Sequence, residues 1–135
     1  PKKARKLMFT DPFVFHAVRA WLNPCKDPFN QQVLPALNNP DWAARLTEAC
    51  VITHYRRKFS TYYIKAEGEI DIAYLDENRF WPVEIKWTKQ LRPKTLKQIS
   101  KYPNSLILTQ SKQSGTIKDI PTIPLPLALL RLSTS

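Results

Sequence analysis

The sequence predicts a single α/β domain in which a mixed sheet is flanked by helices. The chain has 135 residues, with 43% hydrophobic and 24% charged residues, which suits one soluble core. Its periodicity runs in the order helix, three strands, helix, strand. A strand that follows the second helix can pair in parallel through a crossover connection, so the sheet should be mixed.

The N-terminal part predicts a strand, a helix and a long loop. Residues Lys6 to Thr10 suit a short strand. Asp11 is an N-cap residue with Pro12 at the first helical position, which predicts a helix to about Trp21. The stretch from Asn23 to Pro40 contains four prolines, so we expect an irregular loop that is either a functional flap or a partly disordered segment.

The rest of the chain predicts a long helix followed by a hairpin. The helix begins at Asp41 and ends at about Lys58, where three basic residues complement the helix dipole. The turn of the hairpin is expected at residues 76–79. The other expected elements are strands at Thr61–Lys65, Glu69–Leu75, Phe80–Trp87 and Ser105–Thr109, a helix at Lys94–Tyr102 and a terminal helix at Pro124–Leu132.

Two carboxylates and an ammonium group are expected to meet on this hairpin. Asp71 lies on one strand, and Glu84 and Lys86 project from the same face of the next strand because strand side chains alternate. A divalent metal and an attacking water need such a group of charges in phosphodiester hydrolysis. The alternative is a solvated strand face with alternating charge. Acidic residues are depleted in strands, which favours a cation site.

The spacing of these residues resembles the PD-(D/E)xK nuclease superfamily, whose signature is an Asp followed at a distance by Glu-x-Lys. Here these elements are Asp71 and Glu84-Ile85-Lys86, although Ile70 replaces the usual Pro. The resemblance implies a restriction-endonuclease-like α/β sandwich with an αβββαβ core. It also implies that Asp71, Glu84 and the Ile85 carbonyl bind Mg²⁺ or Mn²⁺, while Lys86 positions the water.

Two further positions match members of that superfamily. Glu48 on the helix before the hairpin corresponds to a Glu that completes the metal shell, and Gln98 begins a Gln-x-x-x-Tyr pattern that ends at Tyr102. The resemblance makes Glu48 a catalytic and metal-binding residue and Gln98 a catalytic residue. The alternatives are a salt bridge from Glu48 to Arg45 or to a strand residue, and a Gln and Tyr that share a helix face by geometry alone.

A closer resemblance covers most of the chain. The segments Lys6–Pro12, Leu46–Glu48, Gly68–Asp71 and Pro82–Lys86 resemble the nuclease-like C-terminal domain of archaeal and bacterial AAA-type ATPases. The resemblance implies that residues 1–135 are one nuclease-like domain excised from the C-terminus of a longer ATPase. The ATPase module is then a partner. The chain itself has no Gly-rich phosphate loop.

A net charge of +10 favours a polyanionic partner, and we expect nucleic acid, with DNA the leading candidate. DNA or RNA, endonuclease or exonuclease action, and a homodimer all stay open. The expected phosphate contacts lie at a helix end and after the second strand of the hairpin, with Tyr102 supporting them. These cationic residues are Arg56, Arg57, Lys58, Lys89, Arg92 and Lys94.

The composition also indicates where in the cell the protein is located. The longest apolar stretch, Leu125 to Leu130, contains Pro126 and is too short to span a bilayer. Cys25 and Cys50 suit a reduced setting, so we expect a cytoplasmic protein. The leading hypothesis is a magnesium-dependent nuclease. The alternative is a catalytically silent module that binds DNA or a protein within an AAA-type ATPase.

Overall fold

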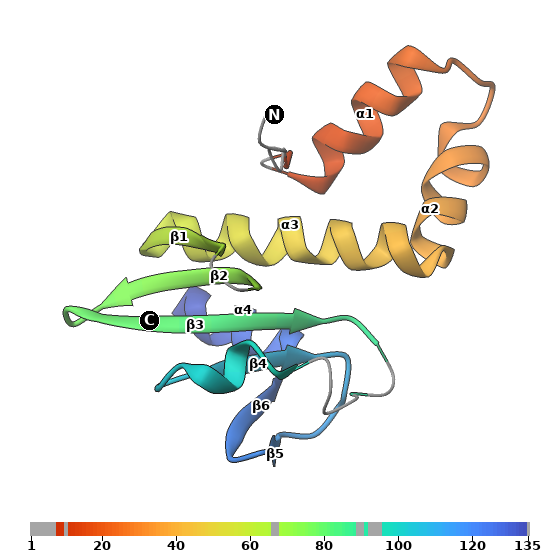
Figure 1. Cartoon of the computed structure of the whole chain (residues 1–135). Helices are drawn as coiled ribbons and strands as arrows, with labels where there is room; N and C mark the ends of the chain where they lie inside the picture. The colour runs from red at the N-terminus through yellow and green to blue at the C-terminus, as the bar shows by residue number, and fades with distance from the viewer. Residues whose placement is uncertain (1–7, 10, 66–67, 89–90, 92–95, 135) are drawn as a thin grey trace, which may run out of the picture. The chain divides into compact units, whose positions relative to one another are not determined.

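The computed structural model describes residues 8–9, 11–65, 68–88, 91 and 96–134 (Figure 1). The chain divides into two compact units, residues 1–53 and residues 54–135. The first unit is helical, and the second holds the whole sheet.

The first helix of the N-terminal unit, α1 (Pro12–Leu22), confirms the expected capping. The Asp11 carboxylate accepts a hydrogen bond of 2.7 Å from the Phe13 amide, and Pro12 occupies the first turn, where an N–H group is not needed. The predicted strand at Lys6–Thr10 falls mostly outside the described residues, and Met8 and Phe9 lie in no strand.

The predicted loop between Asn23 and Pro40 is wrong over most of its length. A π-helical turn, η1 (Phe29–Val33), leads directly into α2 (Leu34–Asn38). The prolines explain the difference, because Pro28 and Pro35 stand at or just before the first turns of these helices, where proline is tolerated. The buried Gln32 ties the segment together by donating to the Asn23 carbonyl and the Cys25 sulfur.

The predicted long helix is confirmed as α3 (Pro40–Lys58). Asn39 caps its first turn, because its side-chain oxygen accepts hydrogen bonds of 3.0 and 3.1 Å from the amides of Asp41 and Trp42. The helix ends with three basic residues in its last turn, as expected.

The C-terminal unit contains one mixed sheet of six strands in the order β1-β2-β3-β4-β6-β5. Neighbours pair antiparallel from β1 to β3, parallel from β3 through β4 to β6, and antiparallel between β6 and β5. This confirms the mixed sheet and the parallel strand after the crossover. The strands are β1 (Ser60–Lys65), β2 (Glu69–Asp76), β3 (Arg79–Lys86), β4 (Leu106–Thr109), β5 (Gly115–Ile117) and β6 (Ile120–Pro124).

Two tight hairpins shape the sheet. Glu77 and Asn78 connect β2 to β3 with φ angles of 47° and 59°. Lys118 and Asp119 connect β5 to β6 with φ angles of 51° and 63°. Positive φ at both central residues is the conformation that matches the twist of antiparallel strands. The first hairpin was predicted, because two alternating strands flank its turn, whereas the short strands β5 and β6 were not predicted.

The helix predicted at Lys94–Tyr102 is wrong in its described part, where a short 3₁₀ helix, η3 (Ile99–Lys101), replaces it. The Ser105 hydroxyl donates to the carbonyls of Ile99 and Tyr102, and the Tyr102 amide donates to Ile99, which closes a tight turn. Pro103 follows immediately and would interrupt an α-helix.

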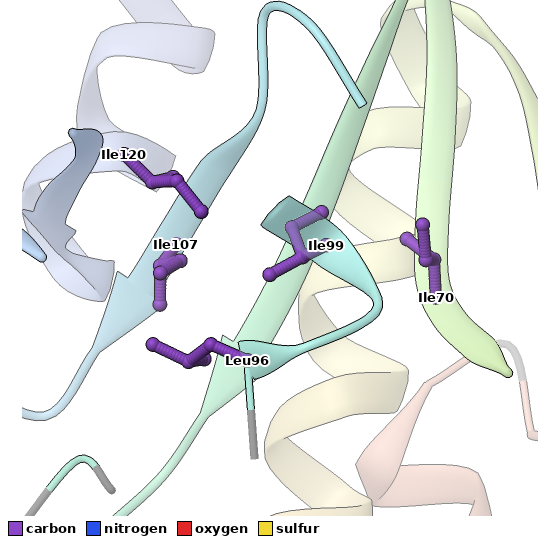
Figure 2. Close-up of a cluster of buried hydrophobic side chains, with 5 residues drawn as sticks. All are labelled: Ile70, Leu96, Ile99, Ile107 and Ile120. Carbon is purple, nitrogen blue, oxygen red and sulfur yellow. The ribbon is translucent and has the colours of Figure 1, made fainter. Parts of the chain in front are cut away.

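A cluster of buried aliphatic side chains fills one face of the sheet (Figure 2). Ile70 of β2, Ile107 of β4 and Ile120 of β6 come from the sheet, and Leu96 and Ile99 come from the segment around η3. The last helix, α4 (Leu125–Thr134), packs against β4 and β6 and confirms the predicted terminal helix. The sheet is therefore flanked by helical segments.

Candidate functional site

An irregularity in β2 separates the two halves of that strand. Tyr62 pairs with Ala73 and Ile64 pairs with Ile70, so three steps along β2 match two steps along β1. One extra residue therefore lies between Ile70 and Ala73, which is a β-bulge. The bulge reverses the side-chain alternation and puts Ile70 in the aliphatic cluster. Asp71 is one of the two residues inside it.

The Asp71 carboxylate contacts the next strand at this bulge. β2 and β3 pair antiparallel. Asp76 pairs with Arg79 at one end of this ladder, and Ile72 pairs with Val83 at the other end. One step further on, Asp71 Oδ2 accepts a hydrogen bond of 2.8 Å from the Ile85 amide. That nitrogen belongs to the peptide group between Glu84 and Ile85. The structure thus brings Asp71 to the Glu-x-Lys segment, as the sequence predicts.

Glu84 and Lys86 share one face of β3, again as predicted. Glu84 Oε1 lies 2.5 Å from Lys86 Nζ, and the Glu84 residue is only 6% exposed. A buried carboxylate is costly unless a positive charge or a hydrogen-bond donor compensates it. Lys86 gives this compensation while a quarter of its side chain stays exposed. β3 is also the expected central strand, with Pro82, Val83 and Ile85 buried.

These groups have the chemistry that Mg²⁺ prefers. Magnesium takes hard oxygen ligands, and one or two carboxylates with waters and substrate phosphate commonly suffice. Asp71, Glu84 and the Ile85 carbonyl are such donors. Within the part of the chain that the structure describes, no three His, Cys, Asp or Glu side chains gather at one place that could hold a metal. A third protein carboxylate therefore stays a prediction.

Gln98 lies against the start of β2. A Cβ atom added to Gly68 would fall 2.9 Å from Gln98 Cγ and 3.0 Å from its amide oxygen. A larger residue at this position would require the Gln98 side chain to shift. Gln98 thus neighbours the strand that carries Asp71, although it does so from a turn rather than from an α-helix. Both Gly68 and Gln98 belong to the sequence motifs, but the sequence did not predict that they lie in contact.

The expected role of Tyr102 in nucleic-acid binding stays a prediction. Its side chain is half-buried and packs against the aliphatic cluster of Figure 2. Arg56 and Arg57 are exposed, as expected for phosphate contacts, and Lys58 lies over the Phe59 ring at 5.8 Å. The remaining expected cations, Lys89, Arg92 and Lys94, lie outside the described residues.

Glu48 belongs to the N-terminal unit, where it lines an open cavity of about 480 Å³ with Arg45. Aromatic rings form much of this cavity. The Phe15 and Trp42 rings lie 5.1 Å apart, and Phe9 packs edge-on to Phe15 at 5.8 Å. The expected role of Glu48 as a metal ligand stays a prediction.

The buried Tyr55 and the half-buried Phe59 and Tyr74 pack the end of α3 against the sheet. The Tyr55 and Tyr74 ring centroids lie 5.0 Å apart, and Phe59 packs on Tyr74 at 4.7 Å. Burial raises the pKa of Tyr55, and the neighbouring Tyr74 adds to the effect. Burial likewise raises the pKa of Tyr74, with a further contribution from Asp76. Both phenols therefore favour the protonated form in the folded protein.

Comparison of this chain with known protein families, with curated proteins and with solved structures finds no match. Among the described residues, no helix is both long and apolar enough to cross a membrane.

Proposed function

We propose that this protein catalyses metal-dependent hydrolysis of phosphodiester bonds in nucleic acid, with DNA as the substrate, on a restriction-endonuclease-like fold. One observation carries the proposal: a β-bulge directs the Asp71 carboxylate onto the peptide group of Glu84 and Ile85. Bulges are over-represented next to active sites, where they re-aim a side chain. The proposal is the PD-(D/E)xK activity that the sequence resembles.

Each residue has a separate part in this proposal. Asp71 and Glu84, with the Ile85 carbonyl, would hold Mg²⁺ or Mn²⁺. A bound metal of this kind stabilises negative charge on a phosphate and makes water more acidic. Lys86 stabilises the charge that develops during the reaction, and the ion pair with Glu84 keeps its ammonium group beside the site.

Glu48 and Gln98 extend the proposed site. Gln98 already lies against the strand that carries Asp71, where its amide could bind a phosphate or a water. Glu48 is included because of the resemblance. Their variants should reduce cleavage less than variants of Asp71, because they support the reaction without supplying the primary metal ligand.

Cleavage assays with matched variants test the proposal. Asp71→Ala, Glu84→Gln and Lys86→Met should each abolish Mg²⁺-dependent cleavage of labelled DNA, because each removes a ligand or a charge. The controls are Lys65→Met and Glu69→Gln, which break an exposed ion pair of 3.8 Å in the same sheet. Equal cleavage by the wild type and the Asp71, Glu84 and Lys86 variants would refute the assignment.

The second candidate is a catalytically silent module that binds DNA or a protein for an AAA-type ATPase. It is favoured by the ion pair between Glu84 and Lys86, because the two groups already compensate each other. The same assay separates the candidates. Tight DNA binding without cleavage in Mg²⁺, Mn²⁺ or Co²⁺ would establish the silent module and remove the nuclease.

A further inference from the structure

Two exposed aromatic rings stand together on the C-terminal unit. Tyr62 of β1 is 50% exposed and Phe80 of β3 is 55% exposed. Their ring centroids lie 5.6 Å apart, with the rings edge to face at 72°. Contiguous exposed apolar surface commonly marks a binding site, whereas single exposed rings are ordinary.

The strand register places this pair on the face of the sheet that also carries Glu84. Tyr62 pairs with Ala73, and Ala73 pairs with Pro82, so these residues share a face. Phe80 and Glu84 lie two residues before and after Pro82 on β3, and alternation gives both the same face. Glu84 lies four positions after Phe80 along the strand, a distance of about 13 Å.

The aliphatic cluster covers part of this face of the sheet, and that cover ends close to Tyr62 and Phe80. Ile64, two residues beyond Tyr62 on β1, packs against the aliphatic cluster beneath η3 (Figure 2). Tyr62 and Phe80 lie beyond that cover and leave ring surface open to a ligand. A ligand on the rings would thus lie on the same face as the Asp71, Glu84 and Lys86 group.

The charge of this unit identifies the ligand as a polyanion. Residues 54–135 contain fourteen Lys and Arg and seven Asp and Glu, which leaves a net charge of +7. The exposed Arg79 directly precedes Phe80 in β3 and adds to this charge, although strand alternation directs its side chain to the opposite face. Aromatic rings beside cations are the usual means of binding single-stranded nucleic acid, where rings stack on bases and cations contact phosphates.

We propose that Tyr62 and Phe80 form a stacking platform for unpaired bases, so that the substrate carries a single-stranded segment next to the cleaved bond. This inference rests on the proposed nuclease function and names its substrate class. A fully paired duplex keeps its bases stacked on one another and offers no free base face within the helix. The platform therefore favours single strands, frayed ends or overhangs over blunt duplex.

Binding measurements test the platform with a control from the same strand. Fluorescence anisotropy compares a labelled oligo(dT) with a blunt hairpin duplex in Ca²⁺ or EDTA, which keeps cleavage from interfering. Tyr62→Ala and Phe80→Ala should each weaken oligo(dT) binding about tenfold or more and leave duplex binding within about twofold. Tyr63→Ala is the control, because Tyr63 is 43% exposed but alternates to the opposite face.

A second variant separates stacking from loss of structure. Tyr62→Phe keeps the ring and should bind oligo(dT) nearly as well as the wild type. Circular dichroism melting of every variant checks that the fold survives. Equal losses for Tyr62→Ala and Tyr63→Ala, or equal losses for oligo(dT) and duplex, would overturn the platform. Indifference of oligo(dT) binding to both Tyr62→Ala and Phe80→Ala would also overturn it, and self-association that depends on these rings would assign them to a protein interface.

The failure of the platform and the failure of the nuclease give different results. Cleavage that requires Asp71 but is indifferent to Tyr62 and Phe80 refutes the platform and keeps the nuclease. Ring-dependent binding of oligo(dT) without any cleavage keeps the platform and refutes the nuclease. A wild type that binds no nucleic acid refutes both.

Discussion

The contact between Asp71 and Ile85 leads to a quantitative prediction. Asp71→Ala removes the acceptor of the Ile85 amide, whose hydrogen bond is 2.8 Å long and partly buried. A buried donor left without an acceptor costs about 1–3 kcal/mol. Since 1.4 kcal/mol corresponds to a factor of ten, hydrogen exchange at the Ile85 amide should accelerate by about 5- to 150-fold.

Hydrogen exchange followed by NMR measures this amide individually. Asp71→Asn keeps an oxygen that can accept the same hydrogen bond but lacks the charge. Hydrogen exchange at the Ile85 amide should therefore accelerate by less than about tenfold. Asp76→Ala is the control, because it removes an exposed carboxylate from the end of the same strand. In Asp76→Ala, the hydrogen-exchange rate of the Ile85 amide should stay within about twofold of the wild-type rate.

The pattern across the variants decides whether the reasoning holds. If hydrogen exchange at the Ile85 amide is unchanged in Asp71→Ala, the Asp71 carboxylate does not hold β2 and β3 together at the bulge. Faster exchange in Asp76→Ala by the same factor would show a general loosening of the hairpin instead. Cleavage adds a second criterion, because Asp71→Asn should abolish it while largely keeping the Ile85 protection.

Three further predictions follow from the metal, the buried phenol and the glycine contact. Mn²⁺ at a hundred times its dissociation constant should stabilise the wild type by about 2.7 kcal/mol, and Asp71→Asn should reduce the rise in melting temperature; a rise of equal size would exclude Asp71 as a ligand. The raised pKa of Tyr55 gives stability that is fully present below pH 10.0, the ordinary pKa, and is lost as pH increases. The melting temperature of Tyr55→Phe should therefore fall less steeply than that of the wild type above pH 10, and parallel curves would contradict this. Gly68→Ala should lower stability by about 1 kcal/mol because its Cβ meets Gln98, whereas Gly115→Ala, with 3.4 Å to the nearest atom, should be almost neutral in the same melting assay.

The sequence alone predicted the parts of this protein that depend on local pattern. Asp11 with Pro12 determined the first helix, and alternation determined the β2–β3 hairpin and the shared face of Glu84 and Lys86. Each of these features depends on residues within a few positions, on capping hydrogen bonds and on side-chain alternation. The parallel pairing of β4 was also predicted, because a crossover connection favours it.

The sequence was a weaker guide to the structure around the prolines and to the type of helix near Gln98. Pro28 and Pro35 indicated a loop but stand at or near the starts of helical turns, where a missing N–H costs nothing. The pattern around Gln98 suggested an α-helix, whereas Ser105, beyond the segment, takes two of its carbonyls and closes a 3₁₀ turn. In each case the outcome depended on which hydrogen-bond partner lay within reach.

Tertiary structure alone decided the features that give the candidate site its shape. The bulge in β2 puts Ile70 in the aliphatic cluster while Ile72 pairs with Val83 of β3, and no local sequence pattern encodes the extra residue. The bulge in turn directs Asp71 to the Ile85 amide. Residue type and alternation determine which charges are available on the two strands, but packing across the sheet determines where they meet, because burial of apolar surface outweighs regular strand pairing at a single position.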